Sequence, residues 1–131
     1  MQAPETCPCG SDQAYMQCCG LVHKTDVVAD TPEALMRSRY TAYVVNDEAY
    51  LLRTWHPSTR PAVLDLHAEG SPQWIGLKIV SKVAGGVGDE TGTVEFVARY
   101  KINGKAHRLQ EKSRFVRENG EWFYVDGEIK T

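Results

Sequence analysis

The feature that most constrains this 131-residue chain is that all four of its cysteines lie between positions 7 and 19. They form two tight pairs, Cys7-Pro-Cys9 and Cys18-Cys19, separated by eight residues. A disulfide framework would spread its cysteines so as to join distant segments, whereas this cluster closes only a small local loop. A structural zinc ion takes four soft ligands in a tetrahedron and leaves no position open for a substrate. The spacing therefore predicts one structural zinc ion bound by Cys7, Cys9, Cys18 and Cys19.

The alternatives are two local disulfides, four free thiols, or a site in which His23 replaces one cysteine. A disulfide between the adjacent Cys18 and Cys19 would be strained. Gly10 and Gly20 each follow a cysteine pair, and we expect them to let the backbone turn close to the metal. Backbone N–H groups of those turns should point at the sulfurs, since four thiolates outweigh the charge of the ion.

The composition describes a folded protein, with 42% hydrophobic and 24% charged residues. A net charge of −2 and a pI of about 6.1 give no electrostatic basis for binding nucleic acid or membranes. No apolar run approaches the roughly 20 residues of a membrane helix. The first residues lack the basic and apolar regions of a signal peptide. We therefore expect a cytoplasmic protein with reduced thiols.

The chain divides into a cysteine-containing knuckle, residues 1–24, and an α+β domain, residues 25–131, which opens with a linker over residues 25–32. Thr31-Pro32-Glu33 is a typical helix start, and the predicted helix runs to about Asn46. A second short helix is predicted over residues 48–54, ending before Pro57. Residues 56–72 are predicted to be a loop with a short helix or strand near residues 63–67.

The last third of the chain predicts a sheet. Apolar alternation indicates strands over residues 75–83, 93–102, 105–117 and 122–125. A glycine-rich turn over residues 85–88 and the pairs Asn103-Gly104 and Asn119-Gly120 separate them. Helices followed by a four-stranded antiparallel meander predict an α+β fold with the helices packed on one face of the sheet.

Arg39 lies near the middle of the apolar face of the first helix. A charged group there needs a partner or a water-filled pocket. Alternation in the third strand places Glu111 on one face with His107, Leu109, Ser113 and Phe115. We expect that face to turn inward and Glu111 to pair with Arg39. The competing partners are Glu95, Asp126 and bound anions.

Two interpretations of these charges remain open. One is a structural ion pair that fixes the fold. The other is a ligand-binding pocket in which Arg39 meets an anionic group. Trp55 and Tyr100 are additional candidates for the pocket wall, although an aromatic residue of this kind is more often part of the core. The predicted ligand-binding residues are Arg39, Tyr40, Tyr43, His56, Trp74 and Glu111.

His56 supports a different class of function. It precedes Pro57 in a loop after a helix, and with Asp47 or Asp65 it could form a His–carboxylate general base. His107 is a weaker candidate. The chain would then be an enzyme of the hydrolase, dehydratase or isomerase type.

The stretch Cys7-Pro-Cys-Gly-Ser-Asp-Gln-Ala-Tyr-Met-Gln-Cys-Cys-Gly20 closely resembles the SEC-C motif, the zinc-binding element at the C-terminus of the SecA translocation ATPase. Residues 34–43, 54–60, 92–100 and 111–118 resemble the bacterial YchJ family. The resemblance covers nearly the whole chain. It implies a SEC-C knuckle followed by a nuclear transport factor 2-like domain, a curved sheet wrapped around helices in a cystatin-like cone, often with a pocket inside.

SecA-type knuckles bind the chaperone SecB, and are linked to ribosome contact, through basic residues. In this knuckle the basic residues Lys24 and His23 are offset by the acidic residues Glu5 and Asp12. The electrostatic basis for binding SecB or the ribosome is therefore weak. The function we expect is that of a zinc-binding adaptor or ligand-binding protein. Its knuckle would contact a protein partner and its domain would hold a small molecule. A third alternative is that the knuckle merely caps a stable scaffold.

Overall fold

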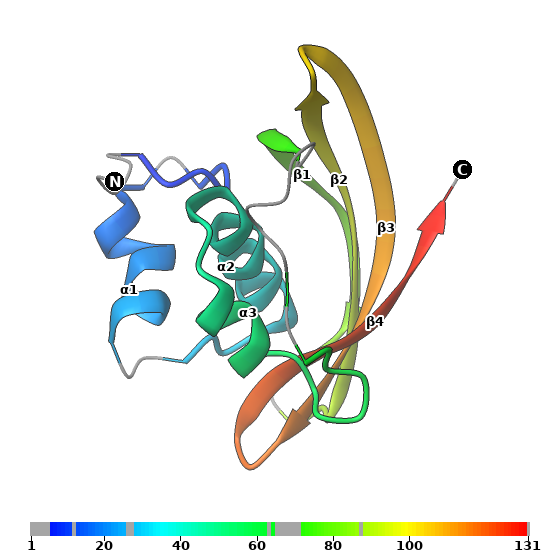
Figure 1. The fold of residues 1–131 in the computed structure, drawn as a ribbon. Helices are drawn as coiled ribbons and strands as arrows, with labels where there is room; N and C mark the ends of the chain where they lie inside the picture. Colours follow the sequence, from blue (N-terminus) through cyan, green and yellow to red (C-terminus); the bar gives the residue numbers. More distant parts are fainter. Residues whose placement is uncertain are drawn as a thin grey trace.

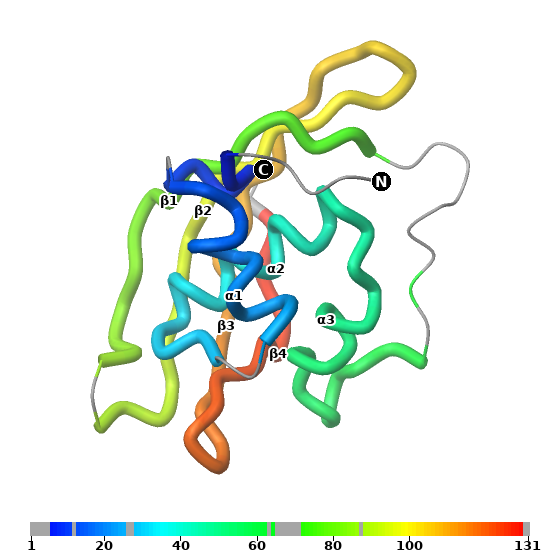
Figure 2. Tube along the Cα trace, turned by 90° about the vertical axis from the view of Figure 1, so that its left-hand side faces the viewer, coloured from blue at the N-terminus to red at the C-terminus, as the bar shows by residue number. Residues whose placement is uncertain are grey.

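A computed structural model describes residues 6–11, 13–25, 28–62, 64, 72–86 and 88–130. Figure 1 shows a curved four-stranded sheet on one side of the molecule, helices α2 and α3 on its concave face, and the N-terminal segment beyond them. The view in Figure 2 places this segment and α1 over α2, with the sheet behind. The α+β class predicted from the sequence is therefore confirmed.

Both predicted helices form close to their predicted limits. Helix α2 spans Pro32–Val45, begins where the Thr31 hydroxyl accepts a hydrogen bond from the Ala34 amide at 3.0 Å, and ends at Asn46 in the left-handed conformation. Helix α3 spans Glu48–Arg53 and is capped by Asp47. No helix in the described ranges is long and apolar enough to cross a bilayer.

The four strands are β1 (Gln73–Ala84), β2 (Thr91–Ile102), β3 (Lys105–Glu118) and β4 (Glu121–Lys130), in antiparallel order β1-β2-β3-β4. Both Asn-Gly turns have positive φ at each residue, as a two-residue hairpin requires. Strand β1 lies at an edge and carries two irregularities in its pairing with β2. Strand β4 is longer than predicted, because pairing with β3 extends through Gly127 to Lys130.

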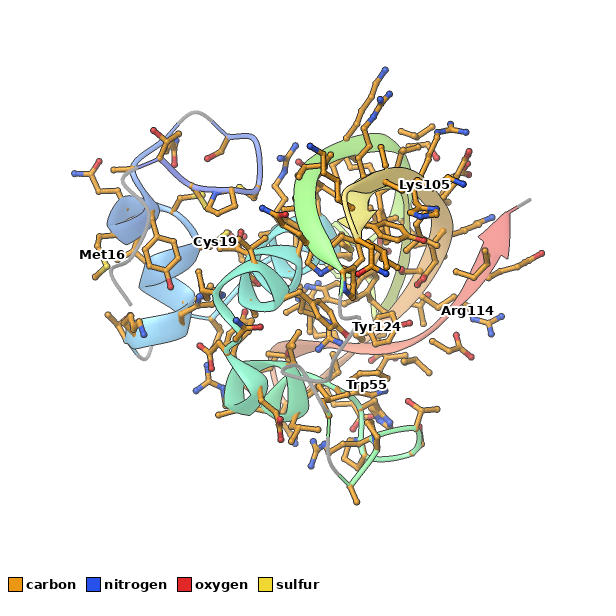
Figure 3. The ribbon with its side chains drawn as sticks, turned by 45° about the horizontal axis from the view of Figure 1, so that its top comes forward. Met16, Cys19, Trp55, Lys105, Arg114 and Tyr124 are labelled. Atoms are coloured by element: carbon orange, nitrogen blue, oxygen red, sulfur yellow. The ribbon has the colours of Figure 1, made fainter. Side chains whose placement is uncertain are left out.

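The inward face of the sheet is the predicted one. Phe115 and Ser113 of β3 are each 1% exposed. Figure 3 shows Arg114, which lies between them in sequence, pointing away from the helices, where it pairs with Asp126. The core is formed by residues of α2 and the inner faces of β2, β3 and β4: Leu35, Met36, Tyr40, Val94, Phe96, Ala98, Phe115 and Trp122.

Two short helices in the knuckle were not predicted. A 3-10 helix, η1 (Tyr15–Gln17), and α1 (Cys19–Lys24) form because Tyr15 packs against Gly20. A β-carbon on Gly20 would lie 2.6 Å from the Tyr15 carbonyl oxygen. Glycine at this position therefore allows the backbone to pack closely against Tyr15, whereas the sequence predicted that it allows a turn. Ala29, in the segment interpreted as a linker, is buried in the main core. The element predicted near residues 63–67 lies outside the described residues, apart from Leu64.

Candidate functional site

The four cysteine sulfurs lie together at the interface between the knuckle and α2. All four Sγ atoms are within 4.8 Å of one another. Cys9 Sγ is 3.6 Å from Cys18 Sγ, and Cys18 Sγ is 4.0 Å from Cys19 Sγ. Sulfurs bound tetrahedrally at about 2.3 Å from zinc would be about 3.8 Å apart. The cluster therefore has the size and the donor chemistry of a four-thiolate metal site.

Polar groups surround these sulfurs. The Ser11 hydroxyl lies 3.2 Å from Cys18 Sγ, and the backbone of Ser11 hydrogen-bonds to Cys9. Hydrogen bonds from the Cys19 and Cys7 thiols lower the pKa of Cys9. The neighbouring Cys7 and Cys9 thiols, together with burial, raise the pKa of Cys19. Four thiolates cannot share this space unless a cation compensates their charge, which is the condition of a metal centre.

The side of α2 that faces the knuckle helps to hold the cluster. Thr41 is fully buried with its hydroxyl 3.7 Å from Cys7 Sγ, and Arg37 donates from Nη1 to the Cys9 carbonyl at 2.6 Å. His23 is not positioned as a ligand. Its Nδ1 lies 2.8 Å from the Tyr15 hydroxyl and its Nε2 lies 2.8 Å from the Ser38 carbonyl oxygen. Both ring nitrogens are therefore engaged.

A second candidate site lies between the opposite side of α2 and the concave face of the sheet. It is a cavity of about 220 Å³. Of the residues predicted to bind a ligand, Arg39, Tyr40, Tyr43, Trp74 and Glu111 line it. Trp55 and Tyr124 complete the wall, with their ring centres 5.1 Å apart. Figure 3 shows Trp55 near the segment after α3 and Tyr124 at β4.

Arg39 is the buried cation of this cavity, only 4% exposed. Its Nη1 donates at 2.8 Å to both the Leu51 carbonyl and the Thr54 hydroxyl, at the C-terminal end of α3. Its Cζ lies 5.0 Å from the Trp55 ring centre and 4.6 Å from the Tyr124 ring centre. Burial lowers the pKa of Arg39, although a guanidinium remains charged in proteins.

The predicted ion pair between Arg39 and Glu111 is not formed. Instead, Glu111 Oε1 accepts hydrogen bonds from the Ser113 hydroxyl at 2.8 Å and the Tyr124 hydroxyl at 3.2 Å. The competing acids face elsewhere: Glu95 accepts from Gln110 and Asp126 accepts from Arg114. The structure records no ion pair between Arg39 and a described carboxylate.

His56 lies outside the described cavity wall. Its Nε2 is 2.7 Å from Glu118 Oε2, and its Nδ1 is 2.7 Å from the Ser58 hydroxyl. The predicted partner Asp47 instead caps α3, and Asp65 lies outside the described residues. The placement of His56 thus supports neither the predicted ligand contact nor a general base in the cavity. Its hydrogen bonds tie the loop after α3 to the end of β3.

Of the two aromatic neighbours of Arg39, Trp55 is a wall candidate from the sequence, whereas Tyr124 was not predicted. The segment after α3 runs beside β4: His56 N donates to the Tyr124 carbonyl at 2.8 Å, and Tyr124 N donates to the Thr54 carbonyl at 2.9 Å. This pairing brings both rings to the guanidinium. The only signal in the sequence is the alternation of Trp122 and Tyr124, which marks one side of β4 as inward.

Comparison with known families agrees with this geometry. The family described as "YchJ, middle NTF2-like domain" matches residues 31–127, which contain the helices α2 and α3 and nearly the whole sheet. The chain belongs to the YchJ family. The SEC-C motif matches residues 4–21, which contain all four cysteines. The YchJ resemblance and the nuclear transport factor 2-like fold inferred from the sequence are thereby confirmed.

Curated relatives of this YchJ-family chain extend over nearly its full length. A UPF0225 protein from Chromobacterium violaceum is 52% identical over 128 residues, covering 96% of this chain and 94% of the relative. A UPF0225 protein from Ralstonia nicotianae is 51% identical over 134 residues, covering 94% and 90%.

Two solved structures share the fold. The solution structure of a SEC-C motif containing protein from Rhodopseudomonas palustris has a TM-score of 0.83 at 33% identity, covering 96% of this chain and 99% of that one. A crystal structure of such a protein from Psychrobacter arcticus has a TM-score of 0.76 at 27% identity, covering 97% and 84%.

Proposed function

We propose that this chain is a small-molecule-binding protein whose knuckle is folded around one structural zinc ion. The observation that carries the proposal is the buried guanidinium of Arg39 in the cavity wall, with no ion pair to a described carboxylate. A structural arginine in a core is normally paired with an acid, because an uncompensated buried charge is costly. The Glu111 charge acts on Arg39 from the same cavity wall without pairing with it, and a ligand in the cavity could supply a directly paired anion.

Zinc is the metal that fits the cysteine cluster. Four sulfur donors with no described imidazole or carboxylate among them suit zinc, and four protein ligands leave no position for a substrate. Cys7, Cys9, Cys18 and Cys19 would hold the ion, whose role there is to fold the knuckle. Thr41 and Ser11 would contribute polar hydrogens beside the sulfurs.

Zinc binding is tested by elemental analysis of protein purified under reducing conditions. We expect about one zinc per chain, lost in Cys9→Ser and retained in Met16→Ser, a control at an exposed knuckle position. Chelation should shift the amide signals of α1 and of Ser38 and Thr41, while the Asn103-Gly104 turn stays unchanged. A folded knuckle that purifies without metal would contradict the zinc proposal.

Ligand binding is tested through the tryptophans. Trp55 and Trp74 line the cavity, whereas Trp122 packs outside it and serves as an internal reference. Trp55→Phe and Trp74→Phe, made one at a time, show which part of the fluorescence change comes from each ring. A small neutral aromatic probe, phenol, should change the fluorescence of Trp55 and Trp74 in a saturable way and leave Trp122 unaffected. An equal response of all three tryptophans would contradict binding in the cavity.

An adaptor role of the knuckle is a second candidate. Met16 is 53% exposed and Leu21 is 39% exposed, so the knuckle carries apolar side chains on its outer surface. Figure 3 shows Met16 on the side away from the sheet. Partner capture with the intact protein, compared with a zinc-retaining Met16→Ser and Leu21→Ser double variant, tests this role. Capture that is unchanged in the variant would contradict it.

A further inference from the structure

The wall of the cavity offers one positive group, Arg39, and one negative group, Glu111, that form no ion pair with each other. Arg39 lies over the face of the Tyr124 ring, with its Cζ 4.6 Å from the ring centre. Glu111 lies beside the hydroxyl of the same residue, with Oε1 3.2 Å from it. The two charges therefore contact different parts of one phenol side chain. A ligand in the cavity could meet both.

Arg39 calls for an anionic acceptor. Its two hydrogen bonds to described residues both leave from Nη1, so Nε and Nη2 keep donors for a bound group. A guanidinium presents its donors in a planar fork that matches a carboxylate. The site is buried, where such a charge-assisted contact is stronger than at the surface. The anionic end of the ligand thus belongs at Arg39.

Glu111 calls for a hydrogen-bond donor. Both hydrogen bonds that fix it arrive at Oε1, and Oε2 has no hydrogen bond to another described residue. The carboxylate is also held in place by the backbone of β4, since a β-carbon on Gly127 would lie 1.9 Å from Oε1. A ligand hydroxyl or amino group could donate to Oε2. The carboxylate would repel a second anionic end.

The cavity wall is rich in aromatic side chains. Half of its lining residues are aromatic: Tyr40, Tyr43, Trp55, Trp74, Phe96 and Tyr124. The volume of about 220 Å³ is that of about seven water molecules at roughly 30 Å³ each. This is enough for one substituted ring and too little for a nucleotide. Stacking and edge contacts favour an aromatic ring over a chain of the same length.

Resting on the proposed function, we propose that the cavity binds a small aromatic carboxylate carrying a hydrogen-bond donor on the far side of its ring, of the hydroxybenzoate or aminobenzoate class. The carboxylate is bound by Arg39 and the hydroxyl or amino group by Glu111. The aromatic wall accepts the ring between them.

The test is a titration of the zinc-replete full-length protein with a matched series of probes. The series comprises 4-hydroxybenzoate, benzoate, its neutral isostere benzamide, phenol, the cation benzylamine, and acetate. Binding is measured by calorimetry and by the fluorescence of Trp55 and Trp74. We expect 4-hydroxybenzoate to bind best, benzoate about tenfold more weakly for one lost hydrogen bond, and benzamide at least about tenfold more weakly than benzoate.

Two variants assign the ends of the ligand. Glu111→Gln should reduce the preference for 4-hydroxybenzoate over benzoate to less than about threefold. Arg39→Met should weaken benzoate by at least about tenfold and phenol by less than about threefold. The comparison of benzoate with benzamide uses the unaltered protein, so it decides the charge preference even if Arg39→Met does not fold.

The outcomes separate the ligand class from the proposed function. If phenol, benzamide or benzylamine binds at the cavity as tightly as benzoate, the aromatic carboxylate class is overturned while small-molecule binding stands. If no probe changes the Trp55 or Trp74 signal, both are overturned. Equal binding of acetate and benzoate would show that the aromatic wall contributes nothing, which also overturns the class.

Discussion

Replacing Gly127 by alanine should destabilise the protein through Glu111. In most strand positions this change is neutral or favourable, because alanine restricts the unfolded chain and gains about 0.4–1 kcal/mol. At Gly127, which has no positive φ, the new β-carbon would lie 1.9 Å from Glu111 Oε1 and 2.5 Å from its Cδ. The carboxylate must therefore move away from β4.

The cost follows from the hydrogen bonds that Glu111 then loses. Oε1 accepts from Ser113 at 2.8 Å and from Tyr124 at 3.2 Å, and the Ser113 side chain is buried. Hydrogen bonds to a charged group contribute about 1.5–3 kcal/mol each. Two such bonds are weakened, and the stabilisation that alanine gives by restricting the unfolded chain offsets part of this loss. We therefore expect the free energy of unfolding to fall by about 2 kcal/mol.

Urea unfolding of a double-mutant cycle measures this effect. In a Glu111→Ala background the obstruction is absent, so Gly127→Ala should be neutral or stabilising by up to about 1 kcal/mol. Gly76→Ala in β1 is the matched control, because no heavy atom lies within 4 Å of a β-carbon built there. If Gly127→Ala costs the same with and without Glu111, the carboxylate is not held against β4 and the reasoning is refuted.

Three further predictions follow from the contacts above. Burial raises the pKa of Tyr15 to about 12, with the Asp47 charge adding to the effect, and burial also raises the pKa of Tyr40 to about 12. In absorbance titrations these two phenols should ionise about two pH units above the ordinary value of 10. The stability that they contribute should be complete below pH 10 and lost between about pH 10 and 12. Thr41→Val should make zinc loss to a chelator about tenfold faster; an unchanged rate would show that its hydroxyl does not support Cys7. His56→Asn should leave probe binding in the cavity unchanged and cost under about 1 kcal/mol of stability, measured by urea unfolding, because Glu118 is exposed.

The elements of the fold were predictable because their signals are local. Thr31 and Asp47 mark helix starts through side-chain caps, and the two Asn-Gly pairs adopt the positive φ values that a tight hairpin requires. Alternation in β3 correctly placed Glu111 on the inner face. The clustering of the four cysteines also followed from their spacing.

The partners of the charged residues were not predictable in the same way. Periodicity places Arg39 and Glu111 on facing surfaces but does not give the distance between them. Arg39 instead reaches the end of α3, and Glu111 reaches Tyr124. The first contact depends on how α3 packs on α2, and the second on the irregular pairing of β3 with β4; both are long-range arrangements. The buried side of α2 that meets the knuckle was not predicted because Ser38 and Thr41 are polar, although the Ser38 hydroxyl has Tyr50 of α3 as a partner and the Thr41 hydroxyl lies beside Cys7.

The pairing irregularities of β1 bear on how this protein avoids aggregation. Ile75, Val80 and Val83 on this edge strand are each about half exposed, which is the composition that invites another strand to add. The register shifts fall between Trp74 and Gly76 and between Ile79 and Ser81, and Lys82, a largely exposed residue that pairs with Glu33, lies beside them. A bulged, lysine-bearing edge does not match a straight incoming strand. Straightening β1 by removing one bulge residue should therefore lower the concentration at which the protein begins to form β-rich aggregates.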